Sequence, residues 1–264
     1  MFSDRLKSRI RKIFTRTNCD IFTQLVRANL KVNEYNSFLG IAWTLLGPAV
    51  LLTVLYFVFS KNFGQDIKAY PLYILVGVVC VNFFTTATNN MVGIFSANRE
   101  FVLNSTISRE ILLASTLALH VYKIMIDLCL CLILSIFYGC LTWKFVILIT
   151  PLLVAFIFLV SGINMILSLL SCFAGDVEYI WMLVMRLLYF ATPIFYSIKS
   201  VHPLVRKAIY FGNPLASFVI SFQGIFMGNL DIASYLYSIF LGILFFIFGC
   251  RVFILIENAA IEQV

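Results

Sequence analysis

Residues 40–59 read GIAWTLLGPAVLLTVLYFVF, a run of twenty residues without a charged side chain. A helix of about 20 apolar residues crosses the hydrocarbon core of a bilayer, so this run predicts a transmembrane helix. Five further windows have the same character. Together with the first, the predicted spans are residues 39–60, 70–92, 121–142, 145–172, 179–198 and 233–255.

The composition supports this interpretation, because 62% of the residues are hydrophobic and only 12% are charged. Soluble globular chains average about 45–50% apolar and about 25% charged residues. The sequence therefore predicts an all-α integral membrane protein with six transmembrane helices. We expect residues 1–264 to form one domain, with an arm at 1–38, the six-span region at 39–255 and a tail at 256–264.

Lysine and arginine residues set the expected orientation, because they are enriched in cytoplasmic segments of membrane proteins. The arm, the 93–120 and 173–178 loops and the C-terminal end carry eleven of them, and the opposite side carries six. Lys123 and Arg186 lie inside predicted spans and are left out of this comparison. Both termini are therefore expected to be cytoplasmic.

The arm has a helical period of apolar residues with basic residues between them. The apolar positions are Phe2, Leu6, Ile10, Ile13 and Phe14, and the pattern continues with Ile21, Phe22, Leu25 and Val26. The pattern predicts an N-terminal amphipathic interfacial helix on the inner membrane surface, whose anionic lipids attract basic residues. The alternative is that these charges only establish the topology.

The predicted outer loop at 199–232 contains a helix start signal, in which Asn213 is the N-cap and Pro214 the first helical residue. Apolar residues follow at helical spacing, and Gly228 can end the helix. The segment is too short to span a bilayer and too apolar for an ordinary loop. With residues 203–211 it predicts short re-entrant helices between spans five and six. They could gate a pathway between subunits or simply rest on the outer membrane surface.

Few residues suggest catalysis. The two histidines, His120 and His202, lie on opposite sides of the membrane in the predicted topology, and the cysteines are interpreted as small buried hydrophobic residues. No metal site is expected, and Asp176 and Glu178 only faintly resemble a metal-holding acidic pair. No Gly-Lys pair occurs, so the sequence has no phosphate-binding loop, and any nucleotide hydrolysis needs another chain.

Ionisable residues inside spans are candidates for function. His120, Lys123 and Asp127 fall on one face of the third predicted helix, where snorkelling and local pairing also explain them. Arg186 lies deeper in the fifth span, so it should face either a water-filled path or a carboxylate.

Aromatic residues cluster in the first and fifth predicted spans, and both spans contain a proline, Pro48 and Pro193. Broken helices are tolerated in a membrane where protein or a cavity satisfies the freed main-chain groups. The aromatic residues either pack in the core and against lipid, or line a pathway for sugars. The candidates for the pathway are Trp43, Tyr56, Tyr189, Phe195 and Tyr196.

Four segments in order resemble the ABC-2 type polysaccharide exporter permeases. LVRANLKVNEYNSFLGIAWTLLGP (25–48) is similar to their opening, and NREFVLNSTISREILLAS (98–115) to their cytoplasmic segment between spans two and three. AGDVEYIWMLVMRLLYFATPIFYS (174–197) resembles their fifth-span signature, and GNPLASFVISFQGIFMG (212–228) their outer helix. The chain departs from the family pattern at Asn33, Glu34, Tyr35, Gly175 and Gln223.

The resemblance implies a homodimer in the bacterial cytoplasmic (inner) membrane that works with a separate ABC ATPase subunit. Such permeases export undecaprenyl-pyrophosphate-linked polysaccharide, such as O antigen, capsule or teichoic polymers. ATP and magnesium would be bound by the partner subunit, so this chain would be a transporter permease with no cofactor of its own. Membrane lipids are expected to contact it, and no nucleic acid is expected as a partner.

The resemblance also implies roles for individual residues. ATPase coupling would involve Arg99, Glu100, Arg109 and Glu110, and the glycan channel Trp43, Tyr56, Tyr189, Phe195 and Tyr196. The outer gate would involve Asn213, Pro214, Phe218 and Phe222, and the lipid head group would meet Arg27 and Lys31.

Three alternatives remain open at this point. The chain could be an ABC-2 exporter of small lipophiles, a membrane sugar transferase, or a channel or carrier that uses no ATP. A transferase should carry several carboxylates on one membrane side, whereas this chain has few.

Overall fold

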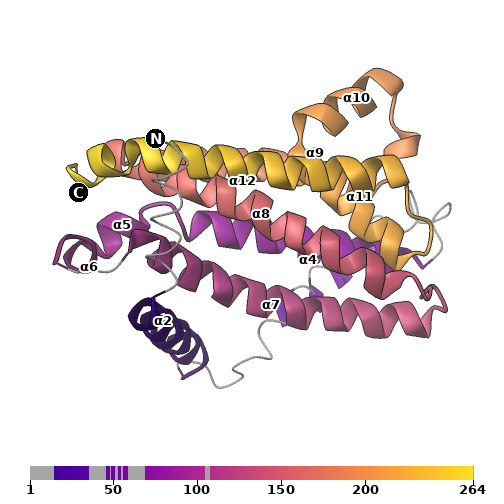
Figure 1. The fold of residues 1–264 in the computed structure, drawn as a ribbon. Coiled ribbons are helices and arrows are strands. Elements are labelled where there is room, and N and C mark those ends of the chain that lie inside the picture. Colours follow the sequence, from indigo (N-terminus) through magenta and orange to yellow (C-terminus); the bar gives the residue numbers. More distant parts are fainter. Residues whose placement is uncertain are drawn as a thin grey trace.

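The computed structural model describes residues 15–35, 46–47, 49–50, 53–54, 56–58, 69–104 and 108–263, and over these ranges the chain forms helices joined by turns, with no strand (Figure 1). The all-α prediction is thereby confirmed. The helices are α2 (Arg16–Tyr35), α4 (Tyr70–Asn89), α5 (Ile94–Ala97), α6 (Arg99–Asn104), α7 (Arg109–Phe137), α8 (Phe145–Phe173), α9 (Val177–Ala191), α10 (Pro203–Gly212), α11 (Pro214–Phe226) and α12 (Ile232–Ile261), with a short 3₁₀ helix at Ile198–Ser200.

Within the described ranges, four helices are long and apolar enough to cross a membrane, namely α4, α7, α8 and α12. They correspond to the second, third, fourth and sixth predicted spans. Helix α7 begins at Arg109, twelve residues before the predicted start of the third span, so part of the loop predicted at 93–120 is helical. Most of the predicted first span lies outside the described residues, although those described within it are helical. The count of six spans therefore stays a prediction.

The fifth predicted span, at 179–198, is shorter in the structure than the sequence suggested. Helix α9 has 15 residues and ends at Ala191, and Thr192 is already extended with φ −89° and ψ 136°. Pro193 explains the early end, because a proline disfavours helical geometry in the residue before it and cannot donate a main-chain hydrogen bond.

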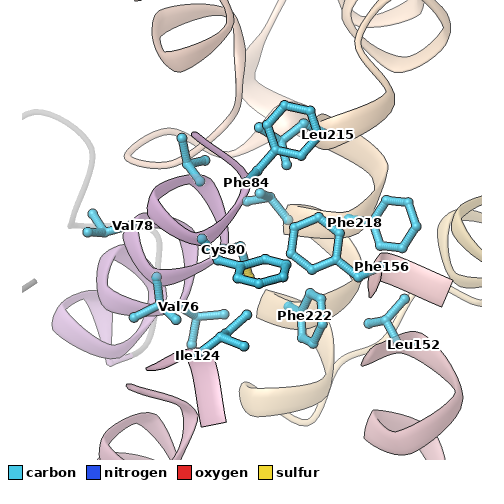
Figure 2. Packing of buried hydrophobic residues seen from close by; sticks show 14 of the residues in the cluster. Val76, Val78, Cys80, Phe84, Ile124, Leu152, Phe156, Leu215, Phe218 and Phe222 are labelled. Atoms are coloured by element: carbon cyan, nitrogen blue, oxygen red, sulfur yellow. The ribbon is translucent and has the colours of Figure 1, made fainter. Parts of the chain in front are cut away.

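The core lies where α4, α8 and α11 meet, with α7 closing one side (Figure 2). Helix α4 is buried along most of its length, and α11 is buried from Leu215 to Phe226. Phe156 of α8 is at the centre, because its ring stacks on Phe218 at 4.9 Å between centroids and contacts Phe222 at 5.6 Å. Such aromatic pairs add to the favourable dispersion contacts of a closely packed interior.

Helices α8 and α12 lie side by side over most of their length and touch through their main chains (Figure 1). A Cβ atom added to Gly242 would overlap the main chain of Ala155, and one added to Gly249 would overlap that of Gly162. Gly242 and Gly249 are seven residues apart on α12, and Ala155 and Gly162 are seven residues apart on α8. The contacts therefore repeat along one line, which we call the α8–α12 seam. Small residues permit such close approach in membranes, where dispersion contacts between helices replace the hydrophobic effect.

We expect Gly242→Ala and Gly249→Ala to lower the thermal stability of the detergent-solubilised protein. The added methyl group would push the two main chains apart at a cost of about 1–3 kcal/mol, more than the roughly 1 kcal/mol that alanine gains in helix propensity. Gly175→Ala is the control, because a Cβ atom there would meet nothing within 4 Å. Equal unfolding midpoints for all three variants would contradict the role of the seam.

Candidate functional site

The short helices α5 and α6 lie at the same end of the molecule as the C-terminal end of α12 (Figure 1). A second hydrophobic cluster holds them there, and its buried residues are Met91, Ile94, Phe95, Val102, Leu112, Leu113, Leu169, Phe253, Ala260 and Ile261. The main-chain N–H of Gly93 also donates to Ser171 Oγ at 2.9 Å. Arg99 and Glu100 remain exposed on this fixed platform.

Arg109 differs from Arg99, because its Nη1 atom lies 2.8 Å from Glu257 Oε1 and forms an ion pair with it. Glu257 is buried, so its carboxylate is largely desolvated, and the positive charge of Arg109 stabilises it. The pair joins the first turn of α7 to the last turns of α12, across 148 positions of sequence. Glu257 was not predicted as a functional residue, and its only signal in the sequence was an acidic side chain in a predicted cytoplasmic tail.

Helix α2 packs against α7 and keeps its basic residues outward. Ile21, Phe22, Leu25 and Val26 are partly buried, whereas Arg27 and Lys31 are exposed, which agrees with the amphipathic pattern predicted for this part of the arm. An apolar cavity of about 440 Å³ lies between α2 and the helices α7, α8 and α12, and Glu110 contributes to its lining. The arm residues before position 15 lie outside the described part of the chain.

At the other end, the chain after α9 is held by two tyrosines of α4 that sequence analysis missed. Tyr70 donates a hydrogen bond from its hydroxyl to the Phe195 carbonyl at 2.7 Å, and Tyr73 donates to the Tyr196 carbonyl at 3.0 Å. The ring of Tyr56 lies 6.5 Å from that of Tyr70. The structure therefore brings three predicted channel residues, Tyr56, Phe195 and Tyr196, to one cluster.

The two other predicted channel residues are not in this cluster. Tyr189 lies on α9 and lines a separate cavity with Arg186, whereas Trp43 lies outside the described residues.

Gln223 satisfies main-chain groups at the break after α9. Its Nε2 atom donates at 3.2 Å to the carbonyls of Tyr73 and Pro193, and lies 3.4 Å from that of Ile194. An unpaired buried carbonyl is costly, particularly where no water can reach it. Gln223 thus links α4, α11 and the segment after α9, and its departure from the family pattern was the signal available in the sequence.

The Asn213 prediction is confirmed as a helix cap, because its Oδ1 accepts from the Leu215 N–H at 3.0 Å. Its Nδ2 donates to Thr192 Oγ1 at 2.8 Å, so the corner between α10 and α11 is tied to the end of α9. Pro214 begins α11, and the two helices are bent by 102°.

The structure places Phe218 and Phe222, predicted as gate residues, in the hydrophobic core with no exposed surface. Helix α10 instead carries exposed apolar residues, including Leu204 and Phe211.

Asp231 caps α12 at the same end of the molecule. Its carboxylate accepts hydrogen bonds from the hydroxyl and the N–H of Ser234, and these bonds hold the pKa of Asp231 below its ordinary value. A carboxyl group with a lowered pKa contributes its stability above the pKa of the unfolded state. That contribution is lost as pH falls through the folded-state pKa.

The intramembrane residues of α7 line one cavity of about 400 Å³. His120, Lys123 and Asp127 face it. The other polar residues that line it are Asn82, Thr86 and Asn89 of α4 and the C-cap residue Asn90, and Gly47 also borders it. His120 is buried, and its Nε2 lies 3.0 Å from Asn90 Nδ2. The grouping of the three α7 residues on one face was predicted, whereas the polar residues of α4 were missed.

The sequence is similar to those of known transport proteins. Residues 21–227 match the family described as ABC-2 type transporter. The chain is 25% identical over 241 residues to an O-antigen export system permease protein RfbA of Klebsiella pneumoniae, covering 89% of this chain and 91% of that protein. It is 26% identical over 208 residues to the RfbA protein of Myxococcus xanthus, covering 78% of this chain and 80% of the relative.

We expect Arg109→Glu to destabilise the protein by about 1–3 kcal/mol, because it leaves the buried Glu257 carboxylate facing a like charge. The double variant Arg109→Glu with Glu257→Arg should recover part of this loss by restoring an opposite-charge pair. Thermal unfolding of the three proteins in the same detergent measures the effect. A double variant less stable than Arg109→Glu alone would argue against the pair.

Proposed function

We propose that this chain, which belongs to the ABC-2 type transporter family, is the permease subunit of an exporter for lipid-linked polysaccharide in the bacterial inner membrane. The observation that carries the proposal is the similarity to O-antigen export permeases over 89% of the chain. The four membrane-length helices described above fit a multi-pass permease. A second copy of the chain would complete the pathway, and a separate ABC ATPase would supply the energy.

The end of the molecule that carries α5 and α6 is the proposed docking surface for the ATPase. Arg99 and Glu100 are exposed there on helices that a hydrophobic cluster holds in place, so a force applied to them reaches α7 and α12. Arg109 has a different proposed role, which is to hold α7 and α12 together through its ion pair with Glu257. Glu110 lies one residue further into α7 and lines the cavity beside α2.

Arg27 and Lys31 are proposed to meet the phosphate-bearing head group of the lipid-linked substrate. Both side chains are exposed on α2. Their positive charges suit a pyrophosphate or an anionic lipid surface.

The aromatic cluster around Tyr56, Phe195 and Tyr196 is the proposed part of the glycan path near the outer end. Aromatic faces can stack on the apolar faces of sugar rings, and the hydrogen bonds from Tyr70 and Tyr73 keep this segment in place. The proposed gate is the bent pair of helices α10 and α11. Helix α10 is the more exposed of the two, and Asn213 ties the bend between them to Thr192. Phe218 and Phe222 would anchor α11 in the core.

Deleting the chain from its host should abolish surface polysaccharide and make undecaprenyl-linked polymer accumulate inside the cell, because synthesis continues without export. Extraction of lipid-linked intermediates and staining of surface polymer measure the two pools. Loss of both pools would point to a sugar transferase, and unchanged pools would point to small lipophiles as the cargo. Either result would contradict the proposal.

Replacing Arg99 by Glu should lower polysaccharide export while leaving membrane insertion and the unfolding midpoint unchanged, because the side chain is exposed and supports no core contact. Lys144→Glu is the matched control, since Lys144 is also an exposed cation but is the N-cap residue of α8, at the other end of the molecule. The measurement is surface polymer per unit of inserted protein. Equal export by the two variants would refute the docking surface at Arg99.

A further inference from the structure

One face of α4 carries a line of polar side chains, which we call the α4 polar stripe. Its members recur at helical spacing of three and four residues and are Asn82, Thr85, Thr86, Asn89 and Asn90. At 1.5 Å per residue the stripe is about 12 Å long. Hydrocarbon cannot satisfy amide and hydroxyl groups, so a polar face on a membrane-length helix calls for polar surroundings.

Two cavities flank the stripe, and Asn89 lines both. The first, of about 400 Å³, has His120, Lys123 and Asp127 of α7 on its other wall. The second, of about 320 Å³, has Arg186 and Tyr189 of α9 on its other wall. Polar groups of three helices thus converge on one region, and Gly47 of the predicted first span borders it.

Three side-chain oxygens in this region are buried, and no described residue forms a hydrogen bond with them. They are Asn89 Oδ1, Asp127 Oδ1 and the Tyr189 hydroxyl oxygen. Asp127 is only 5% exposed, so its carboxylate cannot obtain a full shell of water from the surface. Nearly all buried polar atoms in folded proteins have a partner, which indicates that a hydrogen-bond donor occupies the cavity.

We propose that the α4 polar stripe and Asp127 bind sugar hydroxyl groups of the transported polymer, an inference that rests on the proposed function. Sugar hydroxyl groups can donate hydrogen bonds to Asn89 Oδ1 and Asp127 Oδ1. They can also accept hydrogen bonds from the side-chain amides of Asn82 and Asn90. The hydroxyl of Thr86 donates to the Asn82 carbonyl at 2.8 Å, which leaves its own oxygen as an acceptor.

The charges that line the first cavity favour a neutral ligand over an isolated anion. The Asp127 carboxylate lines the same cavity as the Lys123 side chain, one helical turn away, so the positive charge is offset there. A phosphate group would have to approach the carboxylate, whereas a sugar hydroxyl would donate a charge-assisted hydrogen bond to it. The stripe would therefore select for hydroxyl-rich cargo over apolar cargo, whose surface cannot satisfy these groups.

A photo-crosslinking residue placed at position 89 tests the contact directly in cells that make the native polymer. Irradiation should attach glycan to the full-length chain and give a ladder of heavier bands that stains for carbohydrate. The same residue at position 248 is the control, because Phe248 is exposed on α12 and is already aromatic. Glycan at position 89 and not at 248 is the expected result, and glycan at neither position would overturn the proposal.

A pair of matched variants tests the contribution to export. Asn89→Leu should lower the rate of polymer export by about tenfold, since it removes one acceptor and leaves sugar hydroxyls unpaired. Asn164→Leu is the control, because both amide atoms of Asn164 are also buried without a donor or acceptor among the described residues, but it lines the cavity beside α2. We expect Asn164→Leu to export at the rate of the unaltered chain.

The outcomes separate this inference from the proposed function. If deletion of the chain blocks export but Asn89→Leu and Asn164→Leu export equally, the cavity holds water alone and the stripe proposal is wrong. If deletion leaves surface polymer in place, the proposed function fails and the stripe proposal falls with it.

Discussion

The main-chain contact between α8 and α12 is the constraint on which the rest of the arrangement depends. Without a strong hydrophobic effect between helices in lipid, the glycines at 242 and 249 let the two backbones approach until dispersion contacts hold them. Near the C-terminal end of α12, Glu257 forms its ion pair with Arg109. At the opposite end of the molecule, α12 begins at its N-cap residue Asp231. A single seam therefore fixes both the proposed docking end and the proposed gate end.

The second organising feature is the break after α9, where buried main-chain carbonyls lose their helical partners. Gln223, Tyr70 and Tyr73 donate to its carbonyls, and Asn213 donates to Thr192. These bonds come from α4, α11 and the corner before α11, so the break is a junction of three elements. These hydrogen bonds would couple any movement of the end of α9 to α10 and α11.

Hydropathy predicted where apolar helices occur but not which side chains they bury. It identified the second, fourth and sixth spans, and the Asn213-Pro214 pair correctly marked the start of α11. It placed the third span twelve residues after the start of α7, because Arg109, Glu110, Ser115 and Thr116 make the first two turns of this helix more polar. Phe218 and Phe222 were predicted as gate residues, yet the structure places both in the core. Hydropathy cannot make this distinction, because a phenylalanine has the same hydropathy whether it faces lipid or packs inside the protein.

The sequence by itself determined the helical membrane class, the family and the start of α11, because these follow from residue type over a few turns. Only the tertiary structure decided that Arg109 meets Glu257 and that Gln223 closes the break after α9. It also decided that Asn89 and Asp127 share a cavity. These contacts join residues far apart in the chain, and a pattern of spacing along one helix carries no information about which other helix lies against it.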